Sequence, residues 1–154
     1  MATEIERKFR VDTELWQPSG TGIRLRQGYL SSMKERVVRI RVVGDRAFLT
    51  VKGETKGVSR LEFEYAIPLP DAEQMLEICE KPLIEKTRYI ESCKGRLWEI
   101  DVFHGENEGL IVAEVELASD KEEIVRPSWA REEVSNDPRY FNSSLISNPY
   151  RNWR

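Results

Sequence analysis

The chain has 154 residues, of which 40% are hydrophobic and 33% are charged, and its formal net charge at pH 7 is -3. This length predicts a single domain over residues 1–154 with enough apolar material for a core, and the negative charge argues against a general nucleic-acid-binding protein, because such proteins are usually basic. The two cysteines form no close motif, the first residues contain no apolar signal segment and no apolar run is long enough to span a membrane, so we expect a cytoplasmic protein.

Eight strands are predicted between about residues 4 and 118, because apolar and polar residues alternate there and turn-forming residues separate the runs. They cover about residues 4–11, 21–30, 36–43, 46–52, 59–67, 84–91, 96–103 and 110–118. Short connections predict that neighbouring strands are antiparallel. In the second strand Arg24 and Arg26 share one face, while Gln27 and Tyr29 share the other. The sequence leaves open which pair faces inward, and whether a bulge near Gly28 changes the phase.

Helices are predicted after the fifth strand and at the end of the chain. Pro68 and Pro70 stop the fifth strand, and Asp71 is expected to cap a helix that ends at Ile78 or Cys79. Between about residues 119 and 147 we expect C-terminal helices, at residues 121–123, at 129–134, from 138 onward and at 142–147. The residues expected to cover the outside of the sheet are Trp129, Val134, Tyr140, Phe141, Leu145 and Ile146.

The strands carry charged residues at alternate positions, which places each set on one face of its strand. In the first strand these residues are Glu4, Glu6 and Lys8. The other sets are Arg39/Arg41, Thr50/Lys52, Glu62/Glu64, Lys86/Arg88, Glu99/Asp101 and Glu114/Glu116. Because most of the intervening positions are apolar, one face of the sheet is predicted to be charged and the other to be packed.

Two folds fit this pattern. In the first, an antiparallel sheet packs its apolar face on a core and leaves its charged face in water. In the second, the sheet closes into an eight-stranded antiparallel β-barrel with a charged lumen and with helices packed outside. The charges are sorted by strand into acidic and basic sets, whereas a solubilising face usually mixes the two signs. We therefore favour the closed barrel, a mainly β (α+β) fold.

A lumen of this composition suits metal-dependent phosphoryl transfer. Carboxylates without Cys or His partners favour hard cations such as Mg²⁺ or Mn²⁺, and guanidinium and ammonium groups favour phosphate oxygens. Buried charges are tolerated when they are paired or bound to a metal. The sequence therefore predicts a cavity that holds divalent cations and a small polyanion together, where stabilisation of charge does most of the catalysis.

The same residues resemble a known family. Glu4-Ile5-Glu6-Arg7-Lys8 is similar to the ExExK signature of the CYTH superfamily, the triphosphate tunnel metalloenzymes. The resemblance continues in the family's order through Gln27-Gly28-Tyr29-Leu30, Arg39-Ile40-Arg41, Thr50-Val51-Lys52-Gly53, Glu62-Phe63-Glu64-Tyr65, Lys86-Thr87-Arg88 and Glu114-Val115-Glu116. It spans about residues 4–118 and implies an eight-stranded tunnel. In overall size the chain looks most like the small bacterial members, several of which are inorganic triphosphatases.

The resemblance also implies roles for individual side chains. The implied metal ligands are Glu4, Glu6, Asp101, Glu114 and Glu116. The implied phosphate-binding residues are Lys8, Arg39, Arg41, Lys52, Lys86 and Arg88. The implied catalytic residues are Lys8, Tyr29, Glu62 and Glu64, and one of the last two would serve a second metal and its water. A lumenal Tyr29 implies that Arg24 and Arg26 face outward or lie at the mouth of the tunnel.

We therefore expect Mg²⁺- or Mn²⁺-dependent hydrolysis of inorganic tripolyphosphate inside the tunnel. Three alternatives use the same scaffold: a class IV-type adenylate cyclase, a thiamine or nucleoside triphosphatase, and a non-catalytic polyphosphate-binding protein. A cyclase needs a recognition site for adenine and ribose, and the sequence shows no clear candidate. The expected partner is a small-molecule polyanion, with no nucleic acid and no membrane. The oligomeric state is left open, with a homodimer as one option.

Overall fold

The computed structural model describes residues 2–153 of the chain. The strands are β1 (Thr3–Val11), β2 (Ile23–Ser31), β3 (Arg36–Val43), β4 (Arg46–Gly53), β5 (Ser59–Ile67), β6 (Glu80–Cys93), β7 (Arg96–Phe103), β8 (Ile111–Glu116) and β9 (Ala130–Glu133). The helices are the α-helix α1 (Leu69–Ile78) and the 3-10 helices η1 (Gly105–Asn107), η2 (Pro138–Tyr140), η3 (Asn142–Ile146) and η4 (Tyr150–Asn152).

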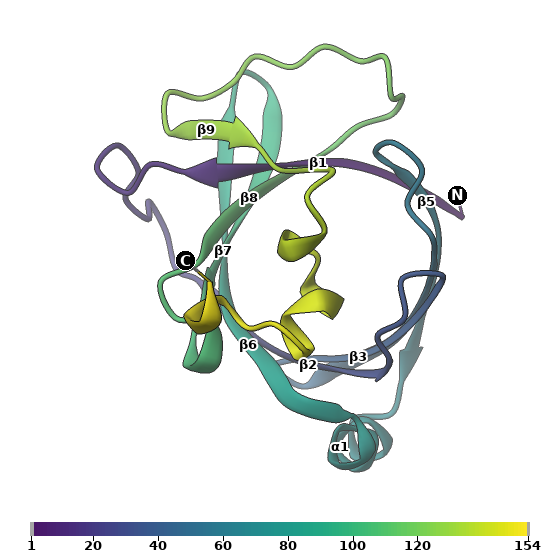
Figure 1. Cartoon of the computed structure of the whole chain (residues 1–154). Helices are drawn as coiled ribbons and strands as arrows, with labels where there is room; N and C mark the ends of the chain where they lie inside the picture. Colours follow the sequence, from purple (N-terminus) through teal and green to yellow (C-terminus); the bar gives the residue numbers. More distant parts are fainter. Residues whose placement is uncertain (1, 154) are drawn as a thin grey trace.

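Strands β1 to β8 close into an antiparallel barrel, seen end-on in Figure 1. Neighbouring strands follow the order β5-β4-β3-β2-β6-β7-β8-β1. The first residues of β1 then pair with β5, with Thr3 opposite Leu61 and Ile5 opposite Ser59, and this pairing completes the ring. The closed barrel predicted from the sequence is therefore confirmed, and the open sheet with one solvated face is excluded.

The outward-facing side chains of the barrel pack in two clusters. α1 lies outside the ring (Figure 1), and its cluster contains Ile40, Val42, Ala47, Ala72, Leu76 and Cys79. The other cluster contains Phe9, Trp16, Trp98, Ile100, Ala113, Val115, Leu117 and Trp129. The helix begins at Leu69, with Pro68 at its N-cap position, so Asp71 lies in the first turn and not at the cap as predicted.

The inward face of β2 carries Gln27 and Tyr29, which are 0% and 2% exposed. Arg26 points outward, where its Nη2 lies 2.7 Å from Oε2 of Glu73 on α1. The register of β2 against β6 shifts between Gln27 and Tyr29, so the strand is irregular at Gly28. The choice that the sequence left open is therefore decided in favour of a lumenal Tyr29.

The helix predicted at residues 129–134 is wrong, because residues 130–133 form β9, which pairs with the end of β1. β1 has left β5 by this point, and its exposed backbone groups need hydrogen-bond partners. β9 and its flank supply them, and the amide of Val134 donates to the carbonyl of Lys8 at 2.8 Å. The helical turn predicted at residues 121–123 is wrong too, since these residues lie in a turn and an irregular segment.

The segment that contains η2 and η3 lies across the inside of the ring of strands (Figure 1). It packs on apolar side chains of the inward face at one end of the barrel, and together they form one buried cluster. The cluster contains Tyr29, Val37, Ile84, Phe103, Leu110, Val112, Val134, Tyr140, Leu145 and Ile146. Trp129 does pack outside. The prediction that Val134, Tyr140, Leu145 and Ile146 cover the outside is wrong, because they belong to this cluster, and it is also wrong for Phe141, which lines the cavity inside the barrel. Their burial closes one end of the barrel, because apolar lumenal residues there need a cover.

The contact between β1 and β9 predicts a pH-dependent contribution to stability. Arg7 donates to Glu133 from Nε to Oε2 at 2.9 Å and from Nη2 to Oε1 at 2.6 Å. These bonds, helped by Ser135, hold the pKa of Glu133 below its ordinary value. A depressed folded-state pKa gives stability that is present above the unfolded-state pKa and is lost as the pH falls through the folded-state value. We expect Glu133→Gln to lower the free energy of unfolding by about 1–2 kcal/mol at pH 7.

Urea denaturation at pH 7 and at about pH 3 measures this difference. The control is Glu132→Gln, because Glu132 and its partner Arg10 are both exposed and their pair contributes little. The free-energy difference between wild type and Glu133→Gln is expected to shrink at the lower pH. An equal difference at both pH values would contradict the assignment of the effect to the ionised carboxylate.

Candidate active site

The predicted site residues meet in one cavity of about 230 Å³ inside the barrel. Its lining contains Glu4, Glu6, Lys8, Tyr29, Arg39, Arg41, Lys52, Glu62, Glu64, Lys86, Arg88, Glu99, Glu114 and Glu116. The side chains of Glu64 and Glu99 are 44% and 42% exposed, so the cavity opens to solvent beside them. Asp101 is the one predicted site residue that does not line the cavity.

The register of the strands places acidic residues opposite basic ones. Lys8 on β1 lies opposite Glu114 on β8, Lys52 on β4 lies opposite Glu62 on β5, and Arg88 on β6 lies opposite Asp101 on β7. Directly opposite residues in antiparallel strands have adjacent side chains. At these three positions opposite charges are therefore paired between strands, whereas Glu6 lies opposite Glu116 and Glu99 lies opposite Glu114.

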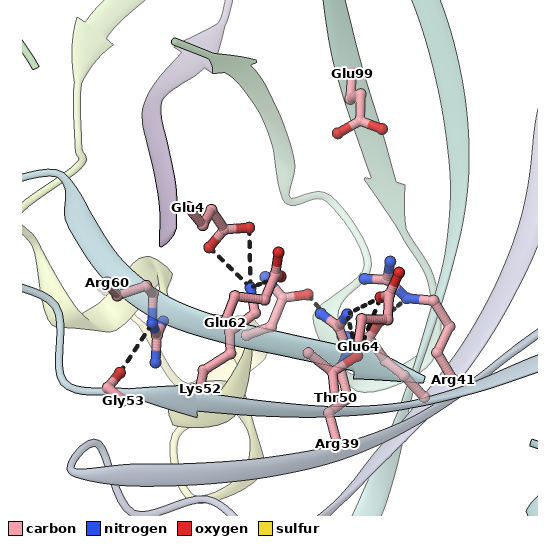
Figure 2. A network of polar contacts seen from close by, with 12 residues as sticks. Glu4, Arg39, Arg41, Thr50, Lys52, Gly53, Arg60, Glu62, Glu64 and Glu99 are labelled. Carbon is pink, nitrogen blue, oxygen red and sulfur yellow. Dashed lines mark hydrogen bonds and ion pairs between the residues drawn. The ribbon is translucent and has the colours of Figure 1, made fainter. Parts of the chain in front are cut away.

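Lys52 joins two carboxylates on one wall of the cavity, as Figure 2 shows. Its Nζ lies 3.1 Å from Oε1 of Glu4 and 3.3 Å from Oε2 of Glu62. Burial, with Glu4 nearby, raises the pKa of Glu62, although Lys52 opposes this effect. The pKa of Glu62 is therefore shifted toward neutral pH relative to that of an ordinary glutamate.

Arg39 lies beside this wall and has spare hydrogen-bonding capacity. Its Nη2 donates to Oγ1 of Thr50 at 3.2 Å and lies 3.6 Å from Oε2 of Glu64 (Figure 2). Its Nε is buried and has no hydrogen-bond partner in the part of the chain that the structure describes. A buried donor of this kind is costly unless a ligand or water satisfies it.

Arg41 adds a further buried cation close to Arg39 and Arg88. Its Nε donates to Oε1 of Gln27 at 2.9 Å. Burial lowers the pKa of Arg41 to about 10, and the neighbouring Arg39 and Arg88 add to this effect. A bound polyanion would relieve this repulsion, because it places negative charge between the guanidinium groups.

Asp101 lies behind two of the cations. Its Oδ2 is 2.7 Å from Nζ of Lys86, and Arg88 donates from Nε to Oδ1 at 2.8 Å and from Nη2 to Oδ2 at 2.9 Å. Burial alone would raise the pKa of Asp101, but Lys86 and Arg88 together hold it below its ordinary value. These contacts make Asp101 the partner that orients both cations. A metal-ligand role would require one of its oxygens to leave a cation, and that role stays a prediction.

Glu6 on β1 and Glu114 on β8 interact next to Glu4 in the cavity. Burial, with Glu114 and Glu4 nearby, raises the pKa of Glu6 well above its ordinary value. Burial would also raise the pKa of Glu114, but Lys8 and Glu6 lower it strongly. The pKa values of these two neighbouring carboxyl groups are therefore shifted in opposite directions.

The donor set of Glu4, Glu6 and Glu114 fits a hard divalent cation, because all its ligating atoms are carboxylate oxygens. Among residues 2–153, no three His, Cys, Asp or Glu side chains are arranged so that they could hold a metal ion without moving. The ammonium of Lys8, opposite Glu114 in the strand register, compensates part of the negative charge. A cation bound to Glu4, Glu6 and Glu114 would require these side chains to move together and to be deprotonated.

The sequence does not predict every residue of the cavity. The additional lining residues are Val37, Arg60, Phe141, Asn142 and Ser143. Arg60 has a usable signal, because it shares a strand face with Glu62 and Glu64, and its Nε donates to the carbonyl of Gly53 at 3.0 Å (Figure 2). Asn142 and its neighbours have no such signal, because only the fold brings the C-terminal segment into the barrel.

Fold and cavity together define a class of protein: a closed antiparallel barrel with an ionic lumen, one end of which is covered by the C-terminal segment. The model of the CYTH domain matches residues 2–150, and the chain belongs to this family. The resemblance noted from the strand motifs is therefore confirmed.

Comparison with known proteins finds relatives over the full length of the chain. An inorganic triphosphatase from Acetivibrio thermocellus is 48% identical over 155 residues, which cover 100% of this chain and 99% of the relative. An inorganic triphosphatase from Nitrosomonas europaea is 40% identical over 149 residues, which cover 93% of this chain and 96% of the relative. A solved structure of an inorganic triphosphatase superposes with a TM-score of 0.69 at 37% identity, covering 97% of this chain and 98% of that chain.

The contacts of Asp101 predict a structural effect that does not depend on metal. Burial lowers the pKa of Lys86 to about 7, and Asp101 opposes this loss of charge. Asp101→Asn should therefore leave two buried cations without their partner and lower the free energy of unfolding by about 3 kcal/mol. Glu99→Gln should cost much less, because Glu99 is partly exposed and meets Arg88 through a single bond.

Chemical denaturation of both variants in EDTA measures these effects, because the chelator removes any contribution from bound metal. Asp101→Asn with wild-type stability in EDTA would contradict the role of Asp101 as the partner of the two cations.

Proposed function

We propose that the protein is a divalent-cation-dependent inorganic triphosphatase that hydrolyses tripolyphosphate. The cavity carries this proposal: cations and carboxylates from most strands of the barrel surround a space whose lining is almost entirely polar. The names of the two curated relatives support it. A small, highly charged and flexible anion needs such a lining and needs no apolar surface.

The cations of the cavity are proposed to bind the phosphate groups. They are Lys8, Arg39, Arg41, Lys52, Lys86 and Arg88. Arg39 has an unsatisfied Nε for a phosphate oxygen. Asp101 holds Arg88 through two hydrogen bonds, so this guanidinium is oriented before the substrate arrives. Oriented donors stabilise the charge of the reacting phosphate without reorganisation.

Glu4, Glu6 and Glu114, with Glu116 beside them, are proposed to hold Mg²⁺ or Mn²⁺. Bound divalent cations would neutralise phosphate charge and lower the pKa of a coordinated water. Without a cation, the negative charge of these carboxylates would repel the anionic substrate. The dependence of hydrolysis on metal follows from this arrangement, because a phosphate group approaches these carboxylates only when a cation neutralises them, whereas binding to the cations of the cavity needs no metal.

The remaining polar groups are proposed to move protons. Hydrolysis adds water across one P–O–P linkage, so the water loses a proton and the products are pyrophosphate and orthophosphate. Glu62, whose pKa is raised by burial, is suited to accept that proton, with Glu64 beside it. Nε2 of Gln27 donates to the hydroxyl oxygen of Tyr29 at 3.1 Å. The hydroxyl proton of Tyr29 is therefore available for another acceptor, which we propose is a phosphate oxygen. We propose the same kind of acceptor for the ammonium of Lys8.

The test is phosphate release from tripolyphosphate, ATP and pyrophosphate in parallel, with Mg²⁺, with Mn²⁺ and with EDTA. Strong metal-dependent release from tripolyphosphate over ATP is expected. Cyclic AMP formed from ATP would support the adenylate cyclase instead. Preference for thiamine triphosphate or a nucleoside triphosphate would support those hydrolases, and tight binding without turnover would support a polyphosphate-binding protein.

Carboxylate variants test the metal assignment. Glu4→Gln and Glu114→Gln should reduce kcat with tripolyphosphate by at least about 100-fold, because each removes a charged ligand from the cation site. Circular dichroism and melting temperature check that both variants remain folded. Glu132→Gln, an exposed change on β9, is the matched control and should keep full activity. Normal turnover by either cavity variant would show that the metal assignment is wrong.

An arginine variant tests the phosphate assignment. Arg39→Ala should raise KM for tripolyphosphate by about 10-fold or more, because it removes charge-assisted hydrogen bonds to phosphate. Arg24→Ala, on the outward face of β2, should leave KM unchanged. Steady-state kinetics at saturating metal measures both. An unchanged KM in Arg39→Ala would remove this residue from the phosphate site.

Two further predictions concern the context of the enzyme. A cytoplasmic location stays a prediction, a homodimer stays one option for an oligomeric state left open, and the proposed substrate is a small-molecule polyanion. Between residues 2 and 153, no helix is both long enough and apolar enough to cross a membrane.

A further inference from the structure

Asn142, the first residue of η3, connects the C-terminal segment to the cations of the cavity. Its Oδ1 accepts hydrogen bonds from Nζ of Lys86 at 2.9 Å and from Nε2 of Gln27 at 3.1 Å. Leu145 and Ile146, in the same helix, belong to the apolar cluster that closes the barrel. Asn142 therefore lies where the polar cavity meets its closed end.

The orientation of the Asn142 amide follows from its partners. A guanidinium group only donates hydrogen bonds, so Nε of Arg41 fixes the oxygen of Gln27 as the acceptor of their contact. The amide nitrogen of Gln27 must then face Asn142, and the ammonium of Lys86 also only donates. Both neighbours donate to Asn142 and therefore need its oxygen Oδ1 as acceptor. The nitrogen Nδ2 consequently lies on the opposite side of the amide group.

This nitrogen is an available donor. Nδ2 of Asn142 has no hydrogen-bond partner among the residues that the structure describes, and it is not one of the buried unsatisfied atoms. The side chain lines the cavity that holds the phosphate-binding cations. Nδ2 therefore faces this space with two N–H groups, next to Lys86.

We propose that Asn142 is a specificity-determining residue, whose Nδ2 donates to the terminal phosphate of a linear polyphosphate that enters the barrel end-first. This inference rests on the proposed function and names the form of substrate that the cavity takes. Leu145 and Ile146 of the apolar cluster follow Asn142 in the same helix and cover this end of the lumen, which favours the end of a chain as the group that reaches Asn142.

The proposal separates substrates by their ends. Tripolyphosphate has two free terminal phosphates and ATP has one, so each can present an end to Asn142. A triphosphate esterified at both ends, such as diadenosine triphosphate, has none, and its bulky groups meet the closed end of the barrel. Discrimination therefore depends on a free terminal phosphate as well as on total charge.

Two variants isolate the donor from the other roles of Asn142. Asn142→Ala removes the donor and also the acceptor that ties η3 to Lys86 and Gln27, but it adds no charge. Asn142→Asp keeps that acceptor, so it preserves the melting temperature, but it replaces the donor with a charged oxygen. The loss of the donor is the change that both variants share. Asn148→Ala, an exposed change in the same segment, is the matched control.

The experiment is calorimetric binding of tripolyphosphate to wild type and to the three variants in EDTA, with melting temperatures of the free proteins. We expect both Asn142 variants to bind at least about 10-fold more weakly than wild type, the loss typical of one hydrogen bond to a charged group, and Asn148→Ala to bind normally. A Kd within twofold of wild type in Asn142→Ala would overturn the proposal.

Competition with wild type supplies the second measurement. Diadenosine triphosphate should displace tripolyphosphate at least about 10-fold less effectively than ATP does. Equal competition would overturn end-first binding. Both measurements report binding and not turnover, so they remain decisive if the protein releases no phosphate. In that case the proposed hydrolysis fails while the role of Asn142 is judged separately.

Discussion

The structure depends on the burial of charged side chains in a lumen that is only partly accessible to water. Removal of a charge from water costs several kcal/mol unless a partner compensates it. The strand register supplies those partners, since Lys8 lies opposite Glu114 and Arg88 lies opposite Asp101. The closed ring restricts this register. If one strand shifted by one residue, all the charged side chains of that strand would turn to the outside.

The compensation is incomplete, and the imbalance is what makes the cavity a site. On one wall Arg39 keeps an unsatisfied donor, and the pKa of Arg41 is lowered by burial and by its cationic neighbours. Burial and two nearby carboxylates raise the pKa of Glu6. The cavity therefore contains both cations and carboxylates whose charge is not fully compensated. A polyanion and a cation bound together would compensate both, which agrees with the tendency of functional sites to break local rules.

The C-terminal segment makes the two ends of the barrel different. Its apolar side chains cover the apolar end of the lumen, and its polar residue Asn142 completes the cavity above them. The exposed carboxylates Glu64 and Glu99 lie toward the solvent-facing side. The lumen therefore passes from an open acidic rim, through paired charges, to a closed end that carries a hydrogen-bond donor.

The sequence by itself determined the barrel strands and nearly all the charged residues of the cavity. It did so because side chains in a strand alternate strictly, so charges at every second position must share a face. The sorting of charges favoured a lumen over a solvated surface, and the pairing of β1 with β5 decided in favour of the lumen. Only the tertiary structure decided the fate of residues beyond 118. Their short segments have weak local preferences, and their conformation follows from what they cover: β9 completes the free edge of β1, and η3 fills the apolar end of the lumen. The roles of Asp101 and Asn142 depend on these contacts between distant segments, which alternation within a strand does not encode.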